Sequence, residues 1–190
     1  QPAAFIGVEF SSAGGRGLQL NGSATGQNLL FTNNGGPAAL ELINIGSLTS
    51  STFTGVQFLG NRSRGVQVNL NSQLHLYAST FTANADYAIE ALNGGASSQL
   101  TWIFLATAAF TNNAGVVRAQ PNSDVIVSGA ITMSNTGIQG IDLTGGTDAN
   151  TVPGAMARSH QWRKGLPYVI RSNDLFLQGS ASLDLLPGVV

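Results

Sequence analysis

Residues 29–42 read LLFTNNGGPAALEL, and this stretch decides the fold. Apolar residues lead to a phenylalanine, a polar run TNNGG follows, and apolar residues then return in alternating order. The phrase FTNN recurs at residues 110–113, and the related phrase FTAN stands at 81–84. The asparagine pair could line a binding site, or the phrase could be one corner of a repeating coil. Short apolar alternation beside a polar corner is typical of β-strands, which favours the coil.

The aromatic residue or methionine that opens each phrase marks a repeat along the chain. These anchors lie 21, 27, 23, 29 and 23 residues apart. A period in the low twenties with variable insertions is the size of one solenoid coil. We expect the anchor side chains to point inward and to stack from coil to coil: Phe10, Phe31, Phe58, Phe81, Phe110 and Met133.

Each coil is expected to contain three short strands. One ends at the anchor, and a second, of the form apolar-x-apolar, begins 7 to 9 residues after it. We expect the third strand between the phrases, at 43–48, 74–77 and 125–127. Three short parallel strands per turn describe a parallel β-helix. The predicted fold class is therefore all-β, with about seven to eight coils.

An asparagine stands three residues after four of the anchors. Asparagine tolerates the left-handed backbone region better than most residues, so it suits a tight corner. Stacked side-chain amides can also hydrogen-bond from one coil to the next. We therefore predict an asparagine ladder rather than a binding site, made of Asn34, Asn61, Asn84 and Asn113.

Charge is sparse in this chain: 8 Lys and Arg residues stand against 9 Asp and Glu residues. Phosphate binding needs clustered cations, so nucleic acid is not expected as a partner. The chain contains no cysteine, which removes disulfides and thiolate chemistry. No apolar run approaches the ~20 residues of a membrane helix, so no membrane span is expected.

Sequence fingerprints of cofactor and metal sites are missing as well. Neither a phosphate-binding loop nor a dinucleotide-binding motif is found, so we expect no cofactor. The two histidines fall in different coils, His75 at an outward strand position and His160 in a loop. They do not predict a metal site, which needs several ligands in one place.

The coil phrases resemble a known family. VEFSSAGGRGLQL (8–20), LLFTNNGGPAALEL (29–42) and STFTANADYAIEAL (79–92) are similar to coils of right-handed parallel β-helix repeat proteins. That family includes pectate-lyase-like enzymes, phage tailspikes and adhesins. The resemblance covers residues 5–147 and implies architecture rather than activity. The stretch 162–190 resembles a segment of large bacterial surface proteins, which implies an extracellular location, secreted or on the cell surface.

We expect a single solenoid domain over residues 1–190. Regular coils should occupy 1–143, an irregular loop or insertion 144–165, and the final coil strands 166–190. Neither end shows a capping element, and an uncapped solenoid exposes strand edges and apolar core. We expect the ends to be covered by further coils or by other copies in a head-to-tail filament.

One set of charged residues is arranged as catalysis would require. The outward positions of the strand after the polar corner should form one external column, which contains Glu90, Arg118 and Asp142. These residues could be a carboxylate pair for glycosidic chemistry with an arginine helper. They could equally be a solvated ladder of alternating charge, which stabilises modestly. The carboxylates should stand ~10 Å apart, two coils from one another, with Arg118 between them. That favours the solvated ladder.

The segment 144–165 breaks the repeat and carries the basic cluster. Loops of repeat proteins are where binding varies, so Trp162, with Arg158 and Arg163, could contact a sugar. The same tryptophan could instead pack over the junction between loop and coil. The favoured function is a structural extracellular β-solenoid that self-associates through its ends. The alternative is a polysaccharide-acting enzyme or a carbohydrate-binding adhesin module.

Overall fold

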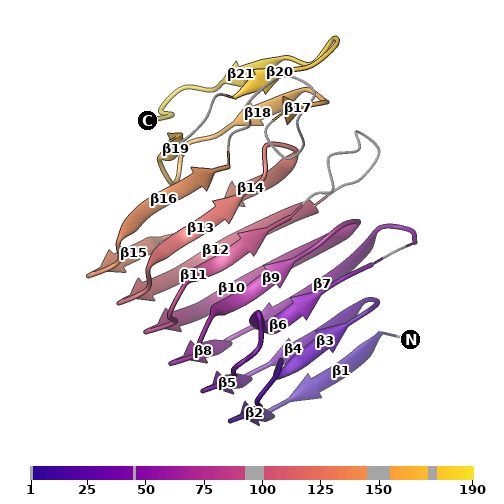
Figure 1. Cartoon of the computed structure of the whole chain (residues 1–190), viewed down its shortest axis with the longest axis vertical. Coiled ribbons are helices and arrows are strands. Elements are labelled where there is room, and N and C mark those ends of the chain that lie inside the picture. The colour runs from indigo at the N-terminus through magenta and orange to yellow at the C-terminus, as the bar shows by residue number, and fades with distance from the viewer. Residues whose placement is uncertain (1, 45, 93–100, 145–154, 171–174) are drawn as a thin grey trace.

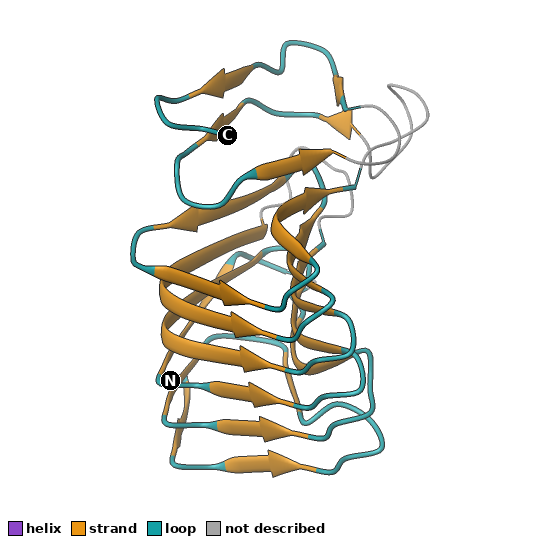
Figure 2. Cartoon of the chain, turned by 90° about the vertical axis from the view of Figure 1, so that its left-hand side faces the viewer, coloured by secondary structure: helices purple, strands orange, loops and turns teal. Residues whose placement is uncertain are grey.

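The structure is a computed structural model that describes residues 2–44, 46–92, 101–144, 155–170 and 175–190. Its described residues form short strands and no helix, and every strand pairing is parallel. The chain winds upward from the N-terminus as a β-solenoid of about seven turns (Figures 1 and 2). The predicted all-β parallel β-helix is thus confirmed.

Two large sheets form the faces of the solenoid. The first sheet has one arm of third strands: β1 (Ala3–Ile6), β4 (Ala24–Gln27), β7 (Thr49–Thr54), β10 (Ser72–Thr82), β12 (Thr101–Thr111) and β14 (Ser123–Val127). Its other arm carries the anchors and meets the first arm in β10 and β12: β2 (Glu9–Ser11), β5 (Leu30–Thr32), β8 (Gln57–Leu59) and β15 (Ile131–Ser134).

The second sheet follows the polar corner. In stacking order it contains β3 (Leu18–Leu20), β6 (Ala38–Leu42), β9 (Arg64–Val68), β11 (Tyr87–Ala91), β13 (Gly115–Ala119), β16 (Ile138–Leu143) and β19 (Tyr168–Ile170). Two strand pairs lie beyond the column: β17 (Ala155–Met156) with β20 (Phe176–Leu177), and β18 (His160–Trp162) with β21 (Leu183–Leu185). We call these last four strands the C-terminal layer, and the described residues of 2–144 the column.

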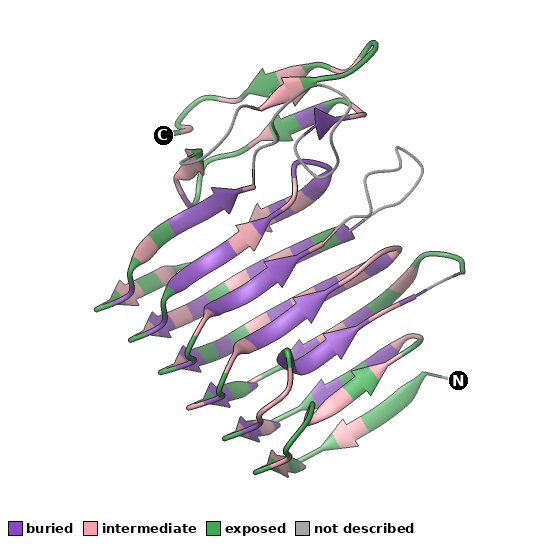
Figure 3. Ribbon diagram, in the orientation of Figure 1, coloured by how far each residue is buried: buried purple, intermediate pink, exposed green. Residues whose placement is uncertain are grey.

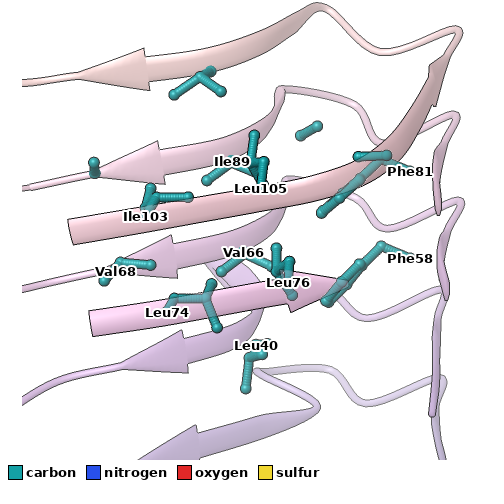
Figure 4. Close-up of a cluster of buried hydrophobic side chains, with 14 of the residues drawn as sticks. Leu40, Phe58, Val66, Val68, Leu74, Leu76, Phe81, Ile89, Ile103 and Leu105 are labelled. Carbon is teal, nitrogen blue, oxygen red and sulfur yellow. The ribbon is translucent and has the colours of Figure 1, made fainter. Parts of the chain in front are cut away.

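The anchor side chains stack through the interior of the column. Successive ring centroids from Phe10 to Phe110 are 4.7, 5.0, 4.7 and 5.0 Å apart, with interplanar angles of 9 to 12°. These spacings match the distance between neighbouring strands, because each ring is carried up by one coil. Met133 continues the column in register with Phe110. Around Phe58 and Phe81 the interior is filled by aliphatic side chains of both sheets (Figure 4).

The predicted asparagine ladder is confirmed. Asn34 donates to Asn61 at 3.1 Å, Asn61 donates to Asn84 at 2.8 Å, and Asn84 donates to Asn113 at 2.8 Å. Amides of the ladder also donate to the backbone carbonyl of the anchor one coil below, as Asn61 does to Phe31. All four side chains are buried. The ladder therefore satisfies corner groups that water cannot reach.

The corner differs from the prediction in which asparagine turns the chain. The left-handed residue stands two positions after the anchor, not three, and its column is Ser12, Asn33, Gly60, Ala83, Asn112 and Asn135. In FTNN the first asparagine adopts the strained backbone, with φ of 56° at Asn33 and 57° at Asn112. The second asparagine forms the ladder. The same residue cannot both adopt the left-handed backbone and place its side chain in the ladder, because the left-handed turn redirects the chain before the next side chain points inward.

A second column of left-handed residues stands three positions before the anchors. It contains Gly7, Asn28, Gly55, Ala78 and Thr107, and it bends the third strand into the anchor strand. The third strand itself was placed too early in one coil: the prediction gave 43–48, whereas β7 runs from Thr49 to Thr54. There Asn44 accepts a hydrogen bond from the Gly46 amide at 3.1 Å, and Gly46 and Ser47 lie in a bend rather than in a strand. The other two placements, 74–77 and 125–127, lie within β10 and β14.

Burial is greatest in the middle of the column and falls towards both ends (Figure 3). Strands β6, β9 and β11 are almost wholly buried, whereas β1, β20 and β21 are half-buried or exposed. Two short strands, β17 and β18, fall within 144–165, and residues 145–154 of that segment lie outside the described residues. The column therefore positions two places of interest: the outer face of the second sheet, and the boundary with the C-terminal layer.

Candidate functional site

The outer face of the second sheet carries a row of polar side chains in strict register. Cα partners run from Gln19 through each successive coil to Val169. We call the polar part of this row the outer ladder: Gln19, Glu41, Gln67, Glu90, Arg118 and Asp142. The structure therefore brings together the three residues that the sequence singled out, with Arg118 between the two carboxylates.

The carboxylates of the outer ladder are buried rather than solvated, which differs from the expectation, whereas Gln19 is exposed and Arg118 is half-buried. Glu90 is 4% exposed and Asp142 is 7% exposed. Arginines from neighbouring coils cover the carboxylates: Arg64 Nε lies 2.8 Å from Glu90 Oε2, and Arg118 Nη1 lies 3.5 Å from Glu90 Oε1. Arg16 pairs with Glu41 in the same way. The long arginine stems exclude water from a surface that strand alternation alone assigns to solvent.

Tyr87 occupies the centre of this face. Its hydroxyl group donates a hydrogen bond to Asp142 Oδ2, two coils further on. The guanidinium carbon of Arg118 lies 4.2 Å from the centroid of its ring, a cation–π contact. Gly115 leaves the space in which the ring lies, because a Cβ atom there would meet it. Tyr87 is thus a site residue that sequence reasoning missed, although the glycine one coil above was a readable signal.

Burial shifts the ionisation of Glu90. Loss of solvent raises the pKa of its carboxyl group above 4.5, and the nearby charge of Asp86 raises it further. Arg64 and Arg118 lower the pKa but do not cancel the effect of burial. A raised carboxyl pKa is what a general acid needs. Here, however, the two carboxylates are each held by protein partners.

A second polar cluster joins the column to the C-terminal layer. Asp124 of β14 accepts from two residues: Arg158 Nη2 lies 2.9 Å from its Oδ2, and His160 Nδ1 lies 2.8 Å from its Oδ1. Arg158 also donates to the Asn122 carbonyl at 2.7 Å. Sequence reasoning put His160 in a loop. The structure places it in β18, where it is 4% exposed, because the segment rejoins the solenoid there.

The ionisation of Asp124 reflects these partners. Its burial would raise the pKa of the carboxyl group, but the hydrogen bond from His160 and the charge of Arg158 outweigh it. The pKa therefore falls below 3.8. Asp124 is a carboxylate at neutral pH and accepts hydrogen bonds only. Sequence reasoning did not single out Asp124, because its partners are 34 and 36 residues away.

A hollow of about 200 Å³ adjoins this cluster. It lies between β14 and β18, and its walls include Trp102, Val125, His160 and Trp162. Trp162 is half-buried and stacks on Tyr168, with ring centroids 4.3 Å apart and an interplanar angle of 4°. Arg163 is exposed and donates to Gln161 at 3.0 Å. The structure thus places Trp162 and Arg163 in the lining of the hollow, while Arg158 pairs with the Asp124 carboxylate beside it.

A family model described as the right-handed β-helix region matches residues 2–154. The chain belongs to the right-handed β-helix family. The match covers the column of this β-helix, including the outer ladder and Asp124, and stops before β17. A search of curated proteins and a search of solved structures each gave no match.

Family membership fixes the architecture and leaves the chemistry to the residues. His75, the other histidine of this β-helix, is half-buried in β10 beside the ring of Phe104. Within the described ranges, three or more His, Asp or Glu side chains do not gather as a metal site would require. The described part of the β-helix also has no helix that is long and apolar enough to cross a membrane.

Proposed function

We propose that this chain is a structural unit of an extracellular β-solenoid, whose end coils stack on further coils. One observation carries the proposal: large apolar side chains are exposed mainly at the two ends of the described structure. Ile6 is 74% exposed in the first coil. At the other end the exposed apolar side chains are Ile170, Leu177, Leu185 and Val190.

The first coil has the geometry that another coil would extend. Strands β1 and β2 are edge strands, each paired on one side only. Phe10 begins the ring stack and is only half-buried, whereas Phe31 above it is fully buried. A coil added below would bury Phe10 and satisfy the open strand edge. Because the two ends differ, contact between copies is head-to-tail and can continue into a filament.

The uses of charge in the column also support a structural role. Most of its charged side chains pair with one another in the outer ladder and around Asp124, where they stabilise coil-to-coil contacts. The proposed extracellular location rests on the sparse, balanced charge and on the resemblance of 162–190 to segments of bacterial surface proteins. Proteins exposed outside a cell benefit from a continuous core and a hydrogen-bonded corner, which resist local opening.

Association of the purified chain tests this proposal. We expect sedimentation velocity to show larger species as concentration rises, and electron microscopy to show elongated particles. Ile6→Asp should weaken association, because it places a charge on β1, the open edge strand that an added coil would pair with. Leu59→Asp is the matched control, since Leu59 is 44% exposed on the flank of the column. A folded monomer at every concentration would contradict the proposal.

The alternative, an enzyme acting on polysaccharide, is favoured by the raised pKa of Glu90 beside the ladder residue Arg118. Its test is turnover: acidic and neutral polysaccharides are incubated with the chain, and new reducing ends or unsaturated products are measured. Activity that is lost in Glu90→Gln, with folding retained, would establish the enzyme. Activity that persists in Glu90→Gln would exclude this carboxyl group as the acid.

A further inference from the structure

The solenoid is interrupted at one level. In the first sheet, β14 is paired with β12 below it, and in the described structure no strand of this sheet follows it. β18 lies at the next level but pairs with β21 instead. The second sheet is continuous there, because β19 pairs with β16. One face is therefore closed, while on the other face side chains hold β18 beside β14, and a hollow lies between these two strands.

The hollow has an apolar part and a polar edge. Val125, Ile141 and Leu143 are core residues of the column that line it. Trp162 adds a flat aromatic wall. The polar edge contains Asp124 and His160, and Ser123, Ser159, Gln161 and Arg163 also line the hollow. A ligand that fills this space meets carbon on the wall of core residues and polar groups, including the imidazole ring, on the other side.

The two nitrogens of His160 differ. Nδ1 faces the Asp124 carboxylate, which accepts only, so in the neutral ring Nδ1 carries the proton and Nε2 has the lone pair. Nε2 is buried and has no hydrogen-bond partner. A buried polar atom without a partner is costly and calls for an explanation. An acceptor of this kind suits a ligand that brings one O–H group.

We propose that the hollow is a binding site for a small phenol, whose ring lies against Trp162 and whose hydroxyl group donates to His160 Nε2. The size of the hollow favours one ring, because about 200 Å³ is below the ~300–1,000 Å³ of pockets for drug-sized ligands. The apolar wall of Val125, Ile141 and Leu143 favours a phenol over a sugar. A sugar ring carries hydroxyl groups all around, and those facing Val125 and Ile141 would be buried without partners.

The C-terminal layer can move to admit the ligand. Nε2 is closed to water in the structure, so the ring of His160 has to shift slightly for a hydroxyl group to reach it. The described contacts between β14 and the strand that carries His160 are made by side chains, chiefly through Asp124. Side-chain contacts open at lower cost than a strand ladder does. Binding therefore gives the unpaired Nε2 atom of His160 a hydrogen-bond partner.

Nuclear magnetic resonance of the two histidines tests the site without any substitution. The intact ¹⁵N-labelled chain is titrated with phenol at neutral pH, and the imidazole resonances are followed. We expect the His160 signals to shift in a saturable way while those of His75 stay in place, because His75 does not line the hollow. Unchanged His160 signals up to millimolar phenol would overturn the proposal.

Matched probes separate the parts of the claim. Toluene has the ring without the hydroxyl group, cyclohexanol has the hydroxyl group without the flat ring, and glucose tests a sugar. Each should bind about tenfold more weakly than phenol, the size of one lost hydrogen bond or stacking contact. His160→Gln should weaken phenol binding while His75→Gln leaves it unchanged. Toluene or glucose binding as tightly as phenol would overturn the proposal.

Discussion

The column and the C-terminal layer are both made of short parallel strands, but different contacts hold them in place. In the column, each coil adds strands to the two sheets, and the four coils from Phe31 to Phe110 each add a ring to the phenylalanine stack and an amide to the asparagine ladder. The C-terminal layer joins the column through β19 and through individual side chains such as Asp124 and Asn122. Repetition gives the column many equivalent contacts, whereas the layer depends on a few specific ones.

Truncation of the ring stack should produce the largest effect. Phe58 lies fully buried between Phe31 and Phe81, so Phe58→Ala leaves a cavity that the coils cannot close. We expect a loss of about 3–5 kcal/mol in the free energy of unfolding, measured by equilibrium urea denaturation. Trp162→Ala in the C-terminal layer should cost less, since that ring is half-buried. Equal losses would show that the layer is as tightly packed as the column.

Adjacent asparagines provide a second test, within one corner of the column. Asn34→Gly removes a buried amide that donates to Phe10 and Asn61, and should cost about 2–3 kcal/mol. Asn33→Gly should change stability by less than about 0.5 kcal/mol, because Asn33 is exposed and glycine accepts its left-handed backbone. Thermal and urea unfolding measure both variants. The opposite order would mean that the first asparagine forms the ladder.

Loss of the Asp124 carboxylate should affect the C-terminal layer alone. Asp124→Asn removes the charge that pairs with Arg158 and orients His160, so β18 and β21 should open more often. Hydrogen exchange followed by mass spectrometry should show faster exchange in β18 and β21, and an unchanged exchange rate in β9 and β11. Acid should open the same strands, because it protonates the Asp124 carboxylate. Because the pKa of Asp124 is lowered, its stabilising contribution is present above pH 3.8 and is lost as pH falls below that value. Uniform loss of protection would contradict the separation of the two regions.

The smallest effect is expected from the outer ladder, and it depends on pH. The pKa of Glu90 is raised above 4.5, so the protonated form favours folding, and this contribution is lost as pH rises through the folded-state pKa. Wild type should therefore lose stability relative to Glu90→Gln as pH rises from the ordinary carboxyl pKa through the raised folded-state pKa. Urea denaturation across this range measures the difference. Wild type that gains stability relative to Glu90→Gln as pH rises would mean that Arg64 and Arg118 outweigh burial.

The repeat made most of the column predictable. Anchors and ladder asparagines recur at nearly constant spacing, and a parallel coil places equivalent positions above one another, so sequence alignment is also structural alignment. The third strand near residues 43–48 was misplaced because that coil is longer than its neighbours, with 27 residues between anchors. An apolar run in such an insertion can form a turn as readily as a strand.

The candidate sites were less predictable because they depend on which side chains reach across coils. Alternation correctly put Glu90 and Asp142 on the outer face, but it does not reveal that Arg64 and Tyr87 cover them. The Asp124–His160 contact joins positions 36 residues apart, across a level where the repeat fails. Without a constant spacing, the sequence offers no alignment that pairs these residues.

The sequence by itself determined that the chain coils into a parallel β-helix. It also determined which of the phenylalanines stack and which of the asparagines form the ladder. Those features depend on local alternation and on a repeat, and both are properties of the linear chain. Only the tertiary structure decided that Asn33 takes the left-handed turn, that the carboxylates of the outer ladder are buried, and that a hollow opens beside His160. These depend on volume, solvent and side-chain reach between coils, which exist only once the coils have stacked.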